Sequence, residues 1–179
     1  MISSPVLRGD ELRVEEITGT EVVPLTYELR YRVWSKETRL IGSFEKIGVI
    51  CDEHETHSRH WAAFSPQGTL VASARLCIHD SQQHVPEEYC YSELDLPRPV
   101  ASINRLVVER SARNRGIAQE LDLRRIEAAK NSGAACIVVA PTNNDRIRAL
   151  EKFGFSLKEF RNKSNYLEDF WLSSMVLEL

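Results

Sequence analysis

VASINRLVVERSARNRGIA, residues 100–118, joins a β-prone apolar run to a basic turn and the start of a helix. We predict a strand over 100–108 and a helix over 114–132. The apolar run 134–140, which ends before Pro141, predicts a second strand buried on both faces. A strand, helix, strand order makes a parallel βαβ unit whose right-handed crossover places the helix start at the carboxyl end of the first strand. Ligands bind at that edge of such sheets.

The rest of the chain extends this unit in both directions without repeats or linkers. Its 179 residues fit one compact domain, residues 1–179. Two irregular segments, 38–58 and 78–99, interrupt the pattern, and the second is long enough to cover a cleft. We therefore predict a mixed α/β (α+β) fold: a twisted mixed sheet with a central βαβ unit and flanking helices. The other predicted elements are strands over 12–17, 60–64, 69–78, 155–161 and 170–178, and helices over 22–37 and 144–153.

Composition excludes several classes of protein. With 42% hydrophobic and 27% charged residues, the chain is neither disordered nor low in complexity. No apolar run reaches the ~18 residues of a membrane-spanning helix, and the first residues do not resemble a signal peptide. The net charge of −3 argues against a general nucleic-acid binder. We expect a cytoplasmic protein without nucleic-acid or membrane partners.

The basic turn at residues 113–118 is typical of an anion site. The first amides of a helix lack internal acceptors and lie at the positive end of the helix dipole. Gly116 permits close approach of a ligand, and Arg113 and Arg115 add charged donors. We predict a pyrophosphate ligand. The turn lacks the three glycines of a dinucleotide fingerprint and the GKS or GKT of a Walker A loop.

The cysteines and histidines do not form a familiar metal motif. The four cysteines contain no CxxC pair, which predicts buried free thiols. Cys51, His54, His57 and His60 recur every three residues, but steps of three on a helix turn by ~60° each and would spread the ligands. No metal site is predicted.

A second motif follows the basic turn, and the two together are typical of a known family. Asn143, Arg146 and the run ALEKFGF at 149–155 follow the second strand. Together with the turn, they resemble the two cofactor-side motifs of the GNAT superfamily of acyl-CoA-dependent N-acyltransferases. The resemblance implies that backbone groups of Val107 and Val108 hold the pantetheine arm and that Asn143 touches the cofactor. It assigns the pyrophosphate to the turn residues Arg113, Asn114, Arg115, Gly116, Ile117 and Ala118.

The first half is similar to the autoinducer-synthase and N-acyl amino acid synthase branch of that superfamily. The similarity implies an acceptor side formed by side chains from well-separated segments. Each of them also fits an ordinary amphipathic helix, solvated loop or surface arginine. The residues are Arg30, Trp34, Asp52, Glu55, Arg75 and Arg105.

Two departures leave the proton chemistry unassigned. Ser102 occupies the position where many family members have a catalytic glutamate. Leu150 occupies the position where many have a tyrosine that acts as the general acid. Neither side chain can do that chemistry. Ser102 and Arg105 are the candidate catalytic residues, with Ser102 holding a relay water and Tyr166 as a donor to the thiolate.

The resulting hypothesis is an N-acyltransferase that moves an acyl group, most simply acetyl, from acetyl-CoA or another acyl-CoA to a small primary amine by direct attack. One alternative is an N-acyl amino acid or acyl-homoserine-lactone type synthase fed by long-chain acyl-CoA or acyl carrier protein. Another is a non-catalytic acyl-CoA-binding regulatory domain. The irregular segments 38–58 and 79–99 would choose the acceptor, and an exposed sheet edge would allow a homodimer.

Overall fold

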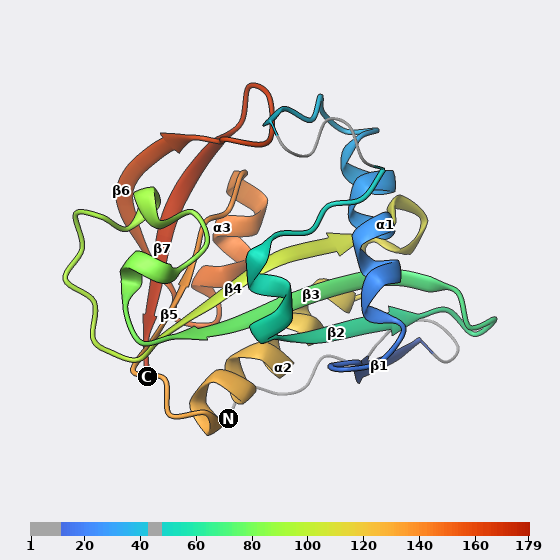
Figure 1. Cartoon of the computed structure of the whole chain (residues 1–179), viewed down its shortest axis with the longest axis horizontal. Coiled ribbons are helices and arrows are strands. Elements are labelled where there is room, and N and C mark those ends of the chain that lie inside the picture. Colours follow the sequence, from blue (N-terminus) through green and yellow to red (C-terminus); the bar gives the residue numbers. More distant parts are fainter. Residues whose placement is uncertain (1–11, 43–47) are drawn as a thin grey trace.

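The protein is built around one seven-stranded sheet, and its computed structural model describes residues 12–42 and 48–179 (Figure 1). The strand order is β1-β2-β3-β4-β5-β7-β6. Among the strands of the described residues, only β4 and β5 pair in parallel, and α2 connects them. The mixed fold and the central βαβ unit are therefore confirmed. The elements are β1 (Arg13–Glu16), α1 (Val23–Trp34), β2 (Ser58–Phe64), β3 (Leu70–His79), β4 (Val100–Val108), α2 (Ile117–Asn131), β5 (Cys136–Val139), α3 (Asn144–Glu151), β6 (Ser156–Lys163) and β7 (Trp171–Glu178).

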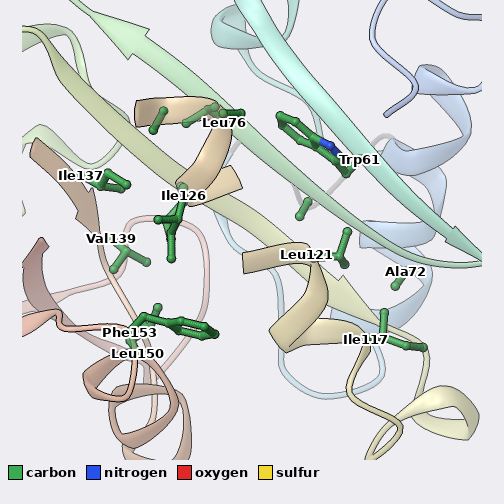
Figure 2. Close-up of a cluster of buried hydrophobic side chains, with 14 of the residues drawn as sticks. Trp61, Ala72, Leu76, Ile117, Leu121, Ile126, Ile137, Val139, Leu150 and Phe153 are labelled. Atoms are coloured by element: carbon green, nitrogen blue, oxygen red, sulfur yellow. The ribbon is translucent and has the colours of Figure 1, made fainter. Parts of the chain in front are cut away.

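Helices cover both faces of the sheet. On one face, α2 and α3 bury Leu121, Ile126 and Leu150 against strand residues such as Leu76 and Ile137 (Figure 2). Burying a leucine or isoleucine side chain contributes roughly 2 kcal/mol, so this cluster is a main source of stability. On the other face, α1 packs its own apolar residues against β4. Figure 1 shows α1 crossing this face of the sheet.

The predicted boundaries were wrong at the turn before α2. The helix begins at Ile117 rather than Asn114, because Asn114 and Gly116 have φ angles of 62° and 81°. These left-handed conformations cannot continue a right-handed helix. The irregular segment 78–99 is packed against the sheet, since it buries Val85 and Tyr91 in a small core with β5 and β7.

The sheet opens between its two central strands. Arg105 has a φ of 53°, and the β3–β4 register shifts there, which marks a β-bulge. Pairing of β4 with β5 is limited to residues 100–102 of β4 and 136–138 of β5. Figure 1 shows the strands diverging beyond this point. Within the described part of the chain, the second half of β4 has no strand beside it on the β5 side.

Two smaller findings complete the fold. All four cysteines are free, and three are buried as predicted, but Cys51 is exposed because it lies in the loop before the short 3₁₀ helix Glu53–His57. In residues 12–42 and 48–179, no helix is both long and apolar enough to cross a membrane.

Candidate active site

Two adjoining hollows lie where β4 and β5 diverge. The first, the central cleft, has a volume of about 280 Å³ and runs along β4 from Ile103 to Val108 and past the end of β5. The second, the helix-start pocket, has about 490 Å³ and lies between the start of α2 and α3. They share the lining residues Leu106, Val108, Arg113, Asn143 and Arg146. The hollows therefore form one groove that crosses the open edge of β4.

The start of α2 faces the helix-start pocket. Gly116, Ile117 and Ala118 line the pocket, as does Asn114 from the preceding turn. Among the described residues, no side chain caps this helix end. The first intrahelical bond runs from the Glu120 amide to the Gly116 carbonyl, so the preceding amides have no acceptor within the helix. An uncapped helix start beside a hollow can bind an anion.

The two predicted arginines of this turn differ in position. Arg113 lines both hollows, donates from Nε to the Val108 carbonyl over 3.1 Å and forms an ion pair with Glu37. Arg115 is exposed and lies outside the lining of both hollows. The structure thus places one of the two side chains at the groove.

Asn143 anchors the opposite wall. Its side chain caps α3 by accepting the Arg146 amide at 2.9 Å, and the residue lines both hollows. Arg146 in turn donates to Asp122, with 2.6 Å between Nη2 and Oδ1. These contacts fix α3 against α2 at the groove.

A buried arginine braces the bulge from behind. Arg125 on α2 is fully buried and donates to the carbonyls of Arg75 at 3.1 Å and Asn104 at 3.2 Å. Asp122 lies 2.5 Å from Arg125 and balances its charge. Burial lowers the pKa of Arg125 to about 10, although the Asp122 charge opposes the shift. The Arg125 guanidinium therefore supplies hydrogen bonds to backbone carbonyls where the bulge interrupts the β3–β4 hydrogen bonding. No local sequence pattern predicts this role of Arg125.

Five of the predicted acceptor-side residues form one ion network. Glu55 accepts from Arg30 at 2.5 Å and from Arg75 at 2.7 Å. Asp52 accepts from Arg75 at 2.5 Å and from Arg105 at 2.7 Å. Burial alone would raise the pKa of Asp52, but hydrogen bonds and charges from the arginines outweigh it and hold that pKa well below its usual range.

Two of the six residues predicted for the acceptor side line the central cleft. Trp34 and Arg105 line the central cleft, whereas Arg30, Asp52, Glu55 and Arg75 do not. Arg30 and Arg75 are fully buried, and their charges are directed at carboxylates. An unpaired buried charge is costly, so these residues serve one another before any ligand. These four residues lie behind Arg105 and outside the lining of the central cleft.

Ser102 and Leu150 also lie away from the cleft lining. Ser102 is 3% exposed. Its hydroxyl accepts from Asn104 Nδ2 at 3.1 Å and lies 3.1 Å from Nε2 of His79. Leu150 packs in the core beside Phe153 (Figure 2). The usual base and acid positions therefore present no titratable group to the groove.

Glu87 and Tyr166 bring titratable groups into the cleft instead. Glu87 has a left-handed φ of 57°, and its carboxylate lies 3.1 Å from the guanidinium of Arg105. Non-glycine residues in this conformation store of order 1–2 kcal/mol each, and such strain gathers at functional sites. The Arg105 guanidinium lies 4.9 Å from the Tyr166 ring, which stacks on Trp34 with 6.4 Å between ring centres.

Sequence reasoning considered Tyr166 but missed Glu87. Burial, and then the Glu87 charge, raises the pKa of Tyr166 well above its usual value, so its hydroxyl keeps its proton. Glu87 lies in the segment predicted to cover a cleft, yet nothing in the sequence separates it from its neighbour Glu88. Only its fold places it beside Arg105.

Comparison with known proteins agrees with this geometry. A profile of the Acetyltransferase (GNAT) family matches residues 23–155, well over half of the chain. A search of curated protein sequences found no match.

Solved structures share the fold at low sequence identity. A GCN5-related N-acetyltransferase from Kribbella flavida aligns with a TM-score of 0.63 and 19% identity over 94% of this chain and 98% of its own. An N-acyl amino acid synthase from uncultured soil microbes gives 0.70 and 10%, over 94% and 91%. A polyamine N-acetyltransferase from Drosophila melanogaster gives 0.67 and 14%, over 94% and 100%. With the family profile covering the βαβ unit, the turn and α3, the chain belongs to the GNAT family of acetyltransferases and is an acyltransferase enzyme.

Proposed function

We propose that this enzyme transfers an acyl group, most simply acetyl, from acyl-CoA to a primary amine by direct attack. The observation that supports this proposal most strongly is the groove. It runs along the unpaired edge of β4, from the uncapped start of α2 to the cleft that contains Glu87 and Tyr166. A Bacillus subtilis acetyltransferase with the same fold was solved in complex with CoA, with a TM-score of 0.59 and 17% identity. That neighbour supports an acyl-CoA donor here.

The donor would lie across the open edge of β4. Amides at the start of α2 would bind the diphosphate, because they face the helix-start pocket without a capping side chain. Backbone groups of Val107 and Val108 would hold the pantetheine arm in place of the missing strand, and Asn143 would contact it from the other wall. Arg113 and Asn114 line the same pocket and would lie beside the diphosphate, and Arg115 would add only long-range attraction.

Glu87 and Tyr166 supply the proton transfers in this proposal. The amine nitrogen bonds to the thioester carbonyl carbon, the C–S bond breaks, and the sulfur keeps the bonding electrons. Glu87 attracts the ammonium and takes one of its protons, and Tyr166 protonates the departing thiolate. The second proton, which nitrogen loses as the amide forms, returns to the Tyr166 oxygen. Arg105 holds the Glu87 carboxylate in the cleft and is a positioning residue here. Ser102 stabilises Asn104 from behind the cleft.

The test is thiol release from acetyl-CoA with a panel of small amines. Glu87→Gln keeps the size of the side chain but removes the base, and kcat should fall by at least ~100-fold. Glu88→Gln makes the same change on the exposed neighbouring residue and should retain activity. Equal activity of both variants would contradict the role of Glu87.

A second panel varies the acyl chain. If the rate of thiol release rises with acyl-chain length, the donor is a long-chain acyl-CoA rather than acetyl-CoA. That result would favour the N-acyl amino acid type of reaction. CoA binding without release for any amine or acyl length would favour a regulatory domain and overturn the proposed reaction.

A further inference from the structure

Four of the five histidines of the chain gather around one hollow that the proposed reaction does not use. This histidine hollow has a volume of about 460 Å³ and shares no lining residue with the central cleft or the helix-start pocket. Three segments meet there: the 3₁₀ helix Glu53–His57, the end of β3 and the turn that follows it. The lining residues are Glu53, His54, His57, Cys77, Ile78, His79, Asp80 and His84.

Two of the imidazoles lie near one another, at a distance slightly longer than a shared metal requires. The ring centres of His54 and His79 are 5.7 Å apart, and the rings are nearly perpendicular at 87°. Metal–nitrogen bonds of ~2.0–2.1 Å in tetrahedral geometry place two imidazole centres about 5 Å apart. To share one ion, the two rings must therefore move closer and turn so that one nitrogen of each faces the metal.

A carboxylate lies beside this pair. The Glu53 Oε1 to His54 Nε2 distance is 3.7 Å, and two ligand atoms of one tetrahedral ion lie ~3.4 Å apart. The Glu53 side chain is 86% exposed, so it can turn toward an ion at low cost. The Asp52 carboxylate accepts the His54 amide at 3.0 Å and fixes the start of the 3₁₀ helix that carries both ligands.

His79 also has the outer partner that a metal-bound histidine normally has. Its Nε2 lies 3.1 Å from the Ser102 hydroxyl, which leaves Nδ1 as the nitrogen for an ion. A ligating imidazole usually donates its second N–H to a nearby acceptor, which sets the tautomer and the ring orientation. Ser102 can fill that role because its hydroxyl oxygen has two lone pairs.

We propose that His54, His79 and Glu53 bind a divalent metal ion of the zinc type, with His84 from the adjacent turn as the fourth ligand. Three imidazoles and one carboxylate suit zinc and its neighbours rather than magnesium or calcium, which prefer oxygen ligands. Local spacing pointed to another set, Cys51, His54, His57 and His60, and gave no site. The fold separates that set, since His60 is buried against Glu55.

Zinc titration of the full chain tests this proposal. Calorimetry at pH 7.5 should give one ion per chain with a Kd below about 20 μM. His54→Ala and His84→Ala should each weaken binding at least ~10-fold, and the double variant at least ~100-fold. His57→Asn removes an exposed imidazole from the same hollow and should change the Kd less than ~3-fold.

Imidazole NMR gives a readout that does not depend on activity. One equivalent of zinc should shift the signals of His54, His79 and His84, and His60 should stay unchanged as an internal control. A Kd above about 20 μM, or a double variant that binds as tightly as the parent, would overturn the site. Equal shifts of all five histidines would overturn it as well.

Discussion

The strongest test of the groove replaces Gly116 by aspartate. Gly116 precedes the first residue of α2 and lines the helix-start pocket. The substitution places a carboxylate where the proposed diphosphate binds. Gly133→Asp is a matched control, because Gly133 follows the end of the same helix, has a similar φ of 75° and has open space for a Cβ.

The two variants separate backbone strain from charge repulsion. Gly116 has a φ of 81°, so each aspartate costs about 1 kcal/mol of folding stability in the left-handed conformation. Only Gly116→Asp adds repulsion: two like charges 4 Å apart at an effective dielectric of 20 repel by about 4 kcal/mol. At twice that distance, with stronger solvent screening, about 2 kcal/mol remains for a doubly charged ligand. CoA binding should therefore weaken by roughly 30- to 1,000-fold.

Calorimetry with CoA measures the difference directly. Gly133→Asp should bind within about 3-fold of the parent and show a similar loss of thermal stability. If Gly116→Asp also bound CoA within 3-fold of the parent, the diphosphate would lie elsewhere. The reasoning about the start of α2 would then be refuted.

Three further predictions follow from the buried charges and the cleft. Asp122→Asn leaves the charges of Arg125 and Arg146 without their shared partner, so urea unfolding should show a loss of ~3–5 kcal/mol, and an unchanged midpoint would contradict that role. The fold lowers the pKa of Asp52 from 3.8, so the ionised carboxylate stabilises the folded state above pH 3.8. This stabilisation is lost as the pH falls through the lowered pKa. In Asp52→Asn, the melting temperature should therefore fall less steeply below pH 4 than in the parent. Tyr166→Phe should lower kcat ~10- to 100-fold with little change in the Kd for CoA, and an unchanged kcat would remove Tyr166 as the acid.

The central βαβ unit was predictable because its signals are local. Val100–Val108 is a strand with the predicted bounds, and Asn143 caps α3 three residues before Arg146, as a helix start requires. The start of α2 was misplaced by three residues, because apolar periodicity does not report a left-handed backbone at Asn114 and Gly116. Strands were also predicted at 155–161 and 170–178, close to β6 and β7, but the position of β7 between β5 and β6 was not predicted.

The side-chain network was not predictable, because its partners are far apart in sequence. Arg105 binds Asp52 across 53 positions, and Arg125 binds the Arg75 carbonyl across 50. The similarity to the synthase branch grouped several of these residues as one acceptor side, but it could not show that their charges neutralise one another inside the protein. The position of Glu87 depends on how segment 78–99 packs. That packing is made against β5 and β7, and the hydrophobic pattern of the segment alone does not predict it.

A crystal structure with bound CoA tests the central claim most directly. We predict diphosphate oxygens about 3 Å from main-chain nitrogens of residues 114–118, and the pantetheine arm beside Val107 and Val108 between the diverging strands. CoA bound at another surface, with this groove empty, would contradict the account.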